Sequence, residues 1–159
     1  NSGCKVFLHP VKKPELYGVA TIKNKKVCKL IEKPKKSESN LAVTGLYFFD
    51  KKVVEYSKSL KPSKRNELEI IEVLKKYMSK KRLKAEYLGR GGAWLDTGSI
   101  NDFYDTSAFV SAIETRQGLK IACLEEIAFN NKWINRNQIM QAIKFYGNSM
   151  YSKYLKDLL

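Results

Sequence analysis

Three consecutive residues, Glu32, Lys33 and Pro34, combine the side-chain types that bind a phosphorylated sugar. Pro34 cannot donate to a strand ladder and favours an extended residue before it, so a strand is predicted to end here with Lys33 extended. Open α/β sheets bind ligands at the carboxyl ends of their strands. A lysine there suits a phosphate, and a carboxylate accepts hydrogen bonds from sugar hydroxyls. Alone, the tripeptide is more typical of surface residues before a turn.

Two glycines interrupt predicted strands: Gly18 follows Tyr17, and Gly45 lies within the apolar run LAVTGLYFF. A glycine weakens a strand unless a ligand or another backbone must approach it closely. The pair therefore indicates either a ligand lying against the sheet, or β-bulges and a tight contact with a helix. The residue pattern leaves both interpretations open.

Asp96 lies in the loop GRGGAWLDTGS, just before Ser99, which is a predicted helix N-cap. Magnesium takes one or two carboxylates in proteins and fills its other positions with phosphate oxygens and water. A single aspartate in a glycine-rich loop could therefore be a Mg²⁺ ligand. The alternative is a turn residue that is stabilised by the dipole of the following helix.

The elements that must position these residues can be predicted from apolar periodicity and turn signals. Strands are predicted at 4–11, 17–22, 26–33, 41–50 and 83–88. Helices are predicted at 51–60, 66–78, 99–116, 124–129, 135–145 and 149–159. The run at 41–50 is almost continuously apolar, which is typical of a strand covered on both faces.

The helices have recognisable start signals. Asn66 with Glu69 three residues on is predicted to cap the second helix, Asn135 with Gln138 the fifth, and Ser149 the last. Strands come first and helices gather later. We therefore predict an α/β body over 1–117 and a small helical annex over 118–159.

Composition limits the class of protein. The chain has 159 residues, 43% of them hydrophobic, enough for one core without disulfides or a structural metal. Lys and Arg number 30 against 16 Asp and Glu, a net charge of +14, which favours anionic partners but also fits a solvated, lysine-rich surface. Cys4, Cys28 and Cys123 lack CxxC spacing and adjoin apolar runs, which predicts buried free thiols and a cytoplasmic location.

Two classes of partner are not expected. The longest apolar run, at 41–49, is too short to cross a bilayer, and the N-terminal residues lack a signal pattern, so no membrane is expected. The basic stretch KSLKPSKRN at 58–66 lacks the stacking aromatic residues of a nucleic-acid surface, so no nucleic acid is expected.

Taken in order, several motifs closely resemble the bacterial glucose-1-phosphate thymidylyltransferase family. They are YGV at 17–19, EKP at 32–34, VTGLYF at 43–48, RNELEI at 65–70 and GGAWLDTG at 91–98. The segment IETRQGLKIACLEEIAF at 113–129 resembles the same family and separates it from other sugar nucleotidyltransferases. Each motif alone is weak, but their order and spacing match over nearly the whole chain.

The resemblance implies a mixed sheet flanked by helices, with a C-terminal helical annex. It covers the second half of a family member. The N-terminal nucleotide-binding half, with its Gly-x-Gly-Thr-Arg-Leu loop and a second metal-binding aspartate, is not in this sequence. In the family, a phosphate oxygen of glucose 1-phosphate attacks the α-phosphorus of dTTP with Mg²⁺, giving dTDP-glucose and pyrophosphate. This half is therefore expected to be inactive alone.

The resemblance also implies roles for individual residues. Lys33 would hold the sugar phosphate, Arg65 would contact the phosphates or the sugar, and Asp96 would be one Mg²⁺ ligand. The residues that bind or shape the sugar pocket would be Gly18, Glu32, Lys33, Val43, Tyr47 and Trp94. A second, regulatory site for dTDP-rhamnose or nucleotide is matched in part by Gly89, Arg90, Glu126 and Ile127.

One residue departs from the family pattern in a way that bears on specificity. Ile71 stands where the family usually carries threonine, which removes a hydroxyl near the sugar, so a sugar-phosphate nucleotidyltransferase of different specificity is one alternative. Another is a non-catalytic assembly or regulatory module. Family members are commonly tetramers, so a homo-oligomer is expected. Apolar annex residues that could serve it, or pack internally, are Trp133, Ile139, Met140, Ile143, Tyr151, Tyr154 and Leu155.

Overall fold

The computed structural model describes residues 2–159 as two compact units. The first unit ends at Trp94, and the second covers Leu95–Leu159. The helix after Ser99 is therefore part of the second unit, so the division between the units lies upstream of the domain boundary predicted at 117/118. That predicted functional boundary stays a prediction.

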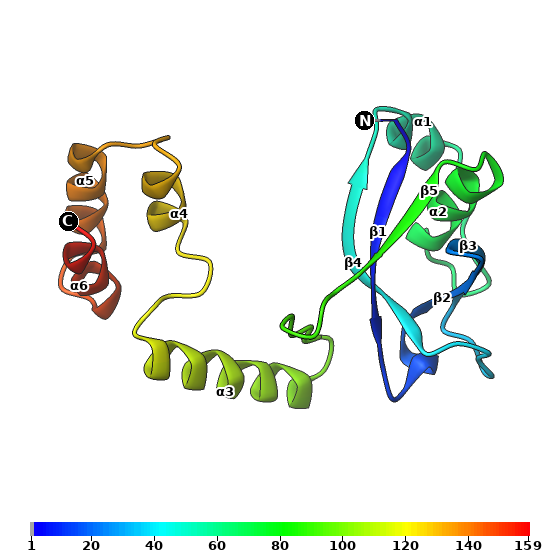
Figure 1. Ribbon diagram of the computed structural model, residues 1–159, viewed down its shortest axis with the longest axis horizontal. Helices are drawn as coiled ribbons and strands as arrows, with labels where there is room; N and C mark the ends of the chain where they lie inside the picture. Colours follow the sequence, from blue (N-terminus) through cyan, green and yellow to red (C-terminus); the bar gives the residue numbers. More distant parts are fainter. Residues whose placement is uncertain (1) are drawn as a thin grey trace. The chain divides into compact units, whose positions relative to one another are not determined.

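The first unit is a five-stranded sheet with helices packed on it (Figure 1). Its elements are β1 (Cys4–Pro10), η1 (Pro14–Leu16), β2 (Gly18–Lys23), β3 (Lys26–Glu32), β4 (Leu41–Phe49), α1 (Lys52–Lys58), α2 (Ile70–Ser79) and β5 (Leu83–Tyr87). The strand order is β3-β2-β4-β1-β5, in which β1 and β5 are parallel and the other pairs antiparallel. This mixed sheet flanked by helices confirms the predicted fold class.

Helix α2 covers the core face of the sheet. Ile71, Leu74 and Tyr77 are at most 1% exposed and share a core with strand residues such as Val6 and Leu8. These helical positions recur at the three- and four-residue spacing of one helix face. They therefore form the buried face of the helix that the sequence predicts at 66–78, whereas Ile70, the first residue of α2, is 37% exposed.

The predicted N-terminus of α2 is wrong. Its N-cap is Glu69, whose side chain makes no capping hydrogen bond, and the helix begins at Ile70. Asn66 instead has φ +61° in a turn in which its N–H donates to the carbonyl of Ser63. Asparagine tolerates this left-handed conformation, which competes with its role as a cap.

Strand β4 differs from the prediction of a strand covered on both faces. Leu46 is 49% exposed and Phe48 60% exposed, because α1 and α2 both pack on the face that carries Tyr47 and Phe49. Gly45 has φ +86° where the pairing with β1 shifts register, and a Cβ there would meet nothing within 4 Å. Gly45 therefore forms a β-bulge, which is one of the two interpretations left open for the strand glycines.

The β2–β3 hairpin contains a second irregularity. Its turn residues Asn24 and Lys25 have φ of +49° and +61°, as the right-handed twist of a tight hairpin requires. The register shifts beyond Thr21, so that Val27 and Leu30 are both buried while Cys28 points outward. The prediction of three buried thiols is therefore wrong for Cys28, which is exposed.

The second unit is helical and follows the predicted pattern. It contains α3 (Ile100–Gln117), α4 (Leu124–Asn130), α5 (Arg136–Tyr146) and α6 (Met150–Asp157). The predicted caps Ser99 and Ser149 each accept a backbone N–H, and Asn135 forms a complete capping box. Cys123, Ile139 and Leu155 form its small core.

Tyrosine hydroxyls tie the annex helices together. Glu125 on α4 accepts hydrogen bonds from Tyr151 on α6 and from Tyr146 on α5, the latter at 3.0 Å. Tyr154 donates to the Oε2 of Glu126 at 2.6 Å. Burial raises the pKa of Glu125, but hydrogen bonds from the Tyr151 hydroxyl, from the backbone N–H of Glu125 and from the Tyr146 hydroxyl together outweigh it, so this pKa lies below its ordinary value of 4.5.

We expect the second unit to lose stability in acid. The folded pKa of Glu125 lies below its unfolded value, so its contribution is complete above about pH 4.5 and is lost as the pH falls through the folded pKa. Denaturant unfolding followed by Trp133 fluorescence in a Trp94→Phe variant, between pH 6 and pH 3, measures this loss.

Glu125→Gln is the control for that experiment and should flatten the pH dependence. It should not abolish it, because hydrogen bonds from Lys120 and the Ile121 N–H also lower the pKa of Glu114. An unchanged slope in Glu125→Gln would contradict the role of the tyrosine network.

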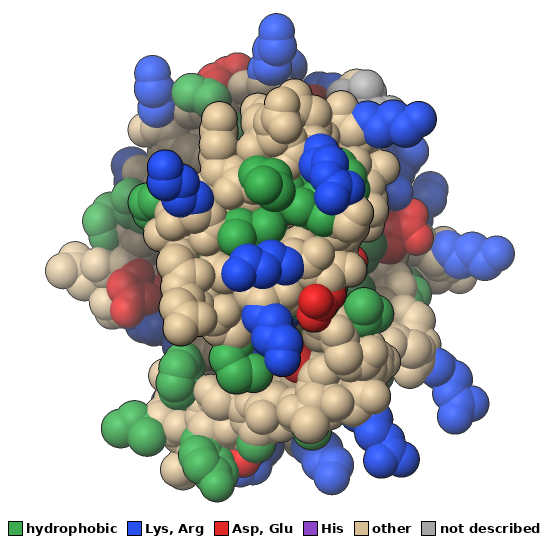
Figure 2. All heavy atoms as spheres, turned by 90° about the vertical axis from the view of Figure 1, so that its left-hand side faces the viewer, with side chains coloured by type: hydrophobic (Ala, Val, Ile, Leu, Met, Phe, Trp, Pro, Cys, Tyr) green, Lys and Arg blue, Asp and Glu red, His purple; other side chains and the backbone are tan. Residues whose placement is uncertain are grey.

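No helix within residues 2–159 is long and apolar enough to span a membrane. On the face shown in Figure 2, lysine and arginine side chains are spread out, with apolar side chains between them. The expected absence of a nucleic-acid partner stays a prediction.

Candidate functional site

The centre of the predicted sugar site is the close approach of Gly18 and Glu32. Gly18 on β2 is paired with Glu32 on β3. A Cβ on Gly18 would lie 2.8 Å from the Cδ1 of Ile71 and 2.9 Å from the Oε2 of Glu32. Gly18 therefore lets a core side chain of α2 and the Glu32 carboxylate share the space above β2, which favours the tight-contact interpretation for this glycine.

We expect Gly18→Ala to destabilise the fold by about 1 to 2 kcal/mol through overpacking. Ile71→Val, ordinarily a loss of about 1 kcal/mol, should be neutral or stabilising in that background because it removes the Cδ1. Urea denaturation of the four variants measures this coupling.

Gly91→Ala is the matched control, since a Cβ there meets nothing within 4 Å, and it should be nearly silent. Additive effects of Gly18→Ala and Ile71→Val would show that the two residues do not compete for space.

Arg65 brings charge to this centre from the loop before α2. Its Nη1 lies 3.6 Å from Glu32 and 3.6 Å from Glu69, and its Nη2 lies 2.8 Å from Glu67. The hydroxyl of Ser63 donates to the Oε1 of Glu69 and accepts the N–H of Arg65. Arg65 thus stands beside Glu32, while its contact with the phosphates or the sugar stays a prediction.

Lys33 and Tyr47, two further candidate residues, interact electrostatically with Glu32. Burial and then the charge of Glu69 raise the pKa of Glu32, while Arg65 and Lys33 oppose the rise. Burial and the charge of Glu32 raise the pKa of Tyr47 to about 12. Tyr47 therefore stays a neutral hydroxyl group at neutral pH, close enough to Glu32 for the charge of that carboxylate to act on it.

Lys33 lies immediately beyond β3, as predicted, but in a different conformation. Its φ is +42°, in the left-handed region, so the predicted extended conformation is wrong. Its N–H donates to the carbonyl of Tyr17 at 3.0 Å, which continues the β2–β3 pairing past Glu32. A non-glycine residue in this region stores strain, and such residues cluster at functional sites.

Val43 and Trp94 differ in their surroundings within the first unit. Val43 is 8% exposed and belongs to the core. Trp94 donates its indole N–H to the carbonyl of Thr44 at 3.0 Å, and its ring lies 5.1 Å from that of Tyr17 and 6.1 Å from that of His9. Sequence reasoning did not predict this aromatic group.

Asp96 lies in the second unit and is described separately. Its Oδ1 accepts the N–H of Thr97 at 2.9 Å, and its carbonyl accepts the hydroxyl of Thr106 at 3.1 Å. Among residues 2–159, no cluster of three or more His, Cys, Asp or Glu side chains could hold a metal. A metal on Asp96 would therefore need oxygen ligands from a substrate and water, which is the usual coordination of Mg²⁺.

The predicted regulatory residues fall in both units. Gly89 and Arg90 belong to the first unit, while Glu126 and Ile127 lie on α4 in the second. The Glu126 carboxylate is engaged by Tyr154, and Ile127 is 43% exposed. Their regulatory role stays a prediction.

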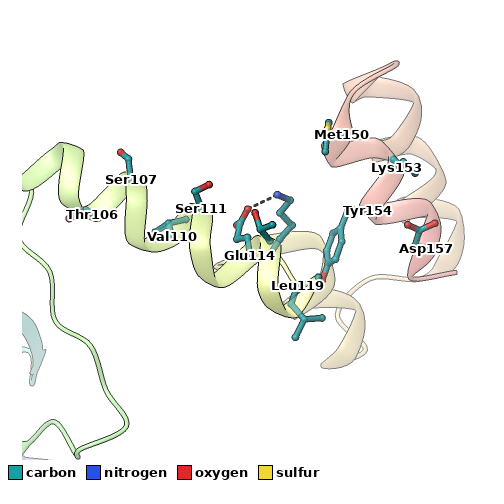
Figure 3. A pocket seen from close by; sticks show the side chains of 13 residues that line it. Thr106, Ser107, Val110, Ser111, Glu114, Leu119, Met150, Lys153, Tyr154 and Asp157 are labelled. Atoms are coloured by element: carbon teal, nitrogen blue, oxygen red, sulfur yellow. Dashed lines mark hydrogen bonds and ion pairs between the residues drawn. The ribbon is translucent and has the colours of Figure 1, made fainter.

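A separate pocket of about 690 Å³ lies between α3 and α6 of the second unit (Figure 3). Glu114 and Lys120 form an ion pair in its lining. The other charged lining residues are Lys153 and Asp157, so the charges balance. This pocket lacks the positive charge that a phosphate requires, unlike the surroundings of Lys33 and Arg65.

Three polar residues around Arg65 were not predicted as part of the site: Ser63, Glu67 and Glu69. The sequence shows the alternation of Arg65, Glu67 and Glu69, but this pattern alone does not place the three side chains together. The turn that contains Asn66, at φ +61°, brings the Glu67 and Glu69 side chains to Arg65. The predicted capping pair had instead assigned Asn66 and Glu69 to the start of a helix.

The profile of the Nucleotidyl transferase family matches residues 1–113. This chain belongs to that family. The predicted resemblance is confirmed by curated relatives named glucose-1-phosphate thymidylyltransferase. The Xanthomonas campestris (strain B100) relative is 45% identical over 157 residues, which cover 98% of this chain and 53% of the relative. The Mycobacterium tuberculosis (strain H37Rv) relative is 42% identical over 159 residues, 99% of this chain and 55% of the relative.

Solved structures of nucleotidyl transferases share the fold. A UDP-glucose pyrophosphorylase in complex with UDP-glucose superposes with a TM-score of 0.58 at 28% identity, covering 67% of this chain and 43% of that one. A Bacillus anthracis protein in complex with a sucrose, assigned as a candidate glucose-1-phosphate thymidylyltransferase, gives 0.62 at 40% identity, covering 69% and 44%. The chain spans about half the length of the curated relatives it matches.

Proposed function

We propose that this chain is the sugar-phosphate-binding part of a glucose-1-phosphate thymidylyltransferase, which forms dTDP-glucose and pyrophosphate from dTTP and glucose 1-phosphate. The observation that supports it is the pairing of Arg65 with Glu32, whose carboxylate lies against Gly18, with Lys33 directly after Glu32. This set supplies a hydroxyl acceptor and two cations within one small region.

In the proposed reaction, this chain binds and orients the nucleophile. The Glu32 carboxylate accepts hydrogen bonds from glucose hydroxyls, and Lys33 and Arg65 hold the phosphate whose oxygen attacks the α-phosphorus of dTTP. Holding the two reactants in line contributes much of the acceleration in such reactions, because little covalent chemistry is left to the protein. Val43, Tyr47 and Trp94 complete the walls of the sugar pocket in this proposal.

Asp96 is the proposed Mg²⁺ ligand. Its Oδ1 accepts one N–H from Thr97. Carboxylate oxygens are hard ligands that Mg²⁺ prefers, and one carboxylate suffices when phosphate oxygens supply the rest. Bound Mg²⁺ would neutralise charge that develops on the transferring phosphate.

The curated relatives are about twice as long as this chain. We propose that nucleotide binding resides in the part of the relatives that this chain does not match, and that these 159 residues alone give no turnover. A cytoplasmic location suits the free thiols.

The test uses a chimera that joins the unmatched part of the Xanthomonas campestris relative to this chain. We expect it to release pyrophosphate from dTTP and glucose 1-phosphate only with Mg²⁺, and we expect this chain alone to bind glucose 1-phosphate without turnover. A soluble, folded chimera without activity, together with no binding of glucose 1-phosphate by the chain, would overturn the proposal. UTP and galactose 1-phosphate serve as alternative substrates that test the effect of Ile71 on specificity.

Assembly is a second function that the annex supports. Trp133 is 72% exposed, Phe145 83% and Met150 81%, whereas Ile139 and Leu155 are buried within the annex. Large exposed apolar side chains are typical of contacts between chains. We propose that this surface helps to form a homo-oligomer, a tetramer in the full-length enzyme, with dTDP-rhamnose or nucleotide bound near Glu126 as a regulator. Sedimentation of wild type and Phe145→Ser tests the assembly.

A further inference from the structure

Glu67 is the closest partner of the Arg65 guanidinium, although it is the most exposed of the three carboxylates around it. The Nη2–Oε2 distance to Glu67 is 2.8 Å, against 3.6 Å from Nη1 to Glu32 and to Glu69. The side chain of Glu67 is 56% exposed, that of Glu32 23% and that of Glu69 11%. The tight ion pair of Arg65 is therefore made on its solvent side.

The backbone around this ion pair is fixed by its own hydrogen bonds. The Ser63 N–H donates to the Glu67 carbonyl at 2.8 Å, and the Asn66 N–H donates to the Ser63 carbonyl at 2.9 Å. The Ser63 hydroxyl accepts the N–H of Arg65 at 3.1 Å. Because these bonds hold the backbone of the turn, Arg65 can change partners by rotation of its own side chain and those of the carboxylates.

The two sides of the guanidinium have different surroundings. Glu69 is nearly buried and accepts the Ser63 hydroxyl at 2.9 Å, so it is a fixed anchor on the inner side. Glu67 accepts from Nη2 on the outer side and lies largely in solvent. Arginine binds phosphate through its N–H edge, so an incoming phosphate must compete for donors that Glu67 occupies.

We propose that Glu67 is an internal competitor for the substrate phosphate: its carboxylate holds Arg65 in the empty site and is displaced when a sugar phosphate binds. Glu69 is the positioning residue that keeps Arg65 beside Glu32 during the exchange. Glu67 thus lowers affinity for every anion at Arg65 and favours ligands that offer a full phosphate dianion. This inference deepens the proposed function and rests on it.

The experiment measures dissociation constants of glucose 1-phosphate, inorganic phosphate and glucose for the whole chain by NMR titration. Glu67→Gln should bind both phosphate ligands about two- to fivefold more tightly, the size expected for loss of one exposed ion pair, and glucose with unchanged affinity. Glu69→Gln should weaken glucose 1-phosphate binding. Glu67→Asp, which keeps the charge, should stay close to wild type.

Glu86→Gln is the matched control. Glu86 is 52% exposed and paired with Lys5 at 3.1 Å, so the variant removes the same charge from a similar exposed ion pair in the same unit. It should leave all three affinities unchanged. An equal gain in Glu86→Gln would show that net charge, and not displacement of Glu67, controls binding, and would overturn the inference.

A second readout separates this inference from the proposed function. Without ligand, the Arg65 Nε–Hε signal should sharpen or shift in Glu67→Gln and not in Glu86→Gln. If wild type binds glucose 1-phosphate but Glu67→Gln binds it no more tightly, the competitor role is wrong and the proposed function stands. If wild type binds no glucose 1-phosphate, the inference fails, and the proposed function is overturned as well when the folded chimera is inactive.

Discussion

Replacing Lys33 with alanine is expected to weaken binding of glucose 1-phosphate by about 100-fold, because it removes a charge-assisted contact to the phosphate. In the chimera described above, the loss should appear in kcat/KM for glucose 1-phosphate. Isothermal titration of the chain and pyrophosphate release by the chimera measure the two quantities.

Lys33→Gly separates the lysine's two properties, its amine and its strained backbone. Lys33 has φ +42°, a conformation that costs a residue with a Cβ about 1 kcal/mol more than glycine. Lys33→Gly should therefore lose binding as Lys33→Ala does, yet be about 1 kcal/mol more stable than Lys33→Ala in urea. Equal stability of the two variants would show that the conformation carries no strain, and retained binding would remove Lys33 from the site.

Replacing Asp96 with asparagine is expected to lower kcat of the chimera by about 100-fold, equivalent to about 2.7 kcal/mol of transition-state stabilisation. Asparagine keeps an oxygen that can accept the Thr97 N–H, so the loop should keep its structure while Mg²⁺ loses an anionic ligand. Initial rates measured over a range of Mg²⁺ concentrations should also show a higher Mg²⁺ requirement.

Asp102→Asn is the control for Asp96. Asp102 is in the first turn of α3 and pairs with the hydroxyl of Ser99, so the variant makes the same charge change nearby without touching the proposed metal ligand. It should reduce helix stability slightly and leave the Mg²⁺ dependence unchanged. If Asp96→Asn behaved like Asp102→Asn, Asp96 would be a turn residue and no metal ligand.

Local signals in the sequence were sufficient for most elements. The helix starts at Ser99, Asn135 and Ser149 were predictable because each cap needs only its own side chain and a backbone N–H three residues on. Strand positions followed from β-branched and aromatic runs bounded by turn residues. Family motifs identified Gly18, Glu32 and Arg65, which the fold brings together.

Two of the errors, at Lys33 and Cys28, arose because the pairing of β3 with the chain segment before it decided the backbone conformation. Lys33 is not extended because its N–H bonds to the carbonyl of Tyr17, a partner no local rule identifies. Cys28 is exposed because the hairpin register shifts beyond Thr21, although the three-residue spacing of Val27 and Leu30 already conflicted with a regular strand.

Glu69 was predicted as part of a helix cap, but its side chain contacts Ser63 and Arg65 instead. Its spacing from Asn66 matched a capping pair, but its carboxylate accepts the hydroxyl of Ser63 and pairs with Arg65, and it makes no capping hydrogen bond. Helix propensity is a weak preference that such tertiary contacts override. The carboxylates around Arg65 could therefore be recognised only once the turn from Ser63 to Glu67 was known.

The outward position of Cys28 gives the chain a chemical handle for spectroscopy. Burial raises the pKa of Cys4 to about 12, which keeps that thiol protonated, and Cys123 is 2% exposed. A maleimide fluorophore or nitroxide should consequently attach first at Cys28, on the same strand as Glu32. Ligand arrival at the end of that strand can then be monitored in the unmutated protein.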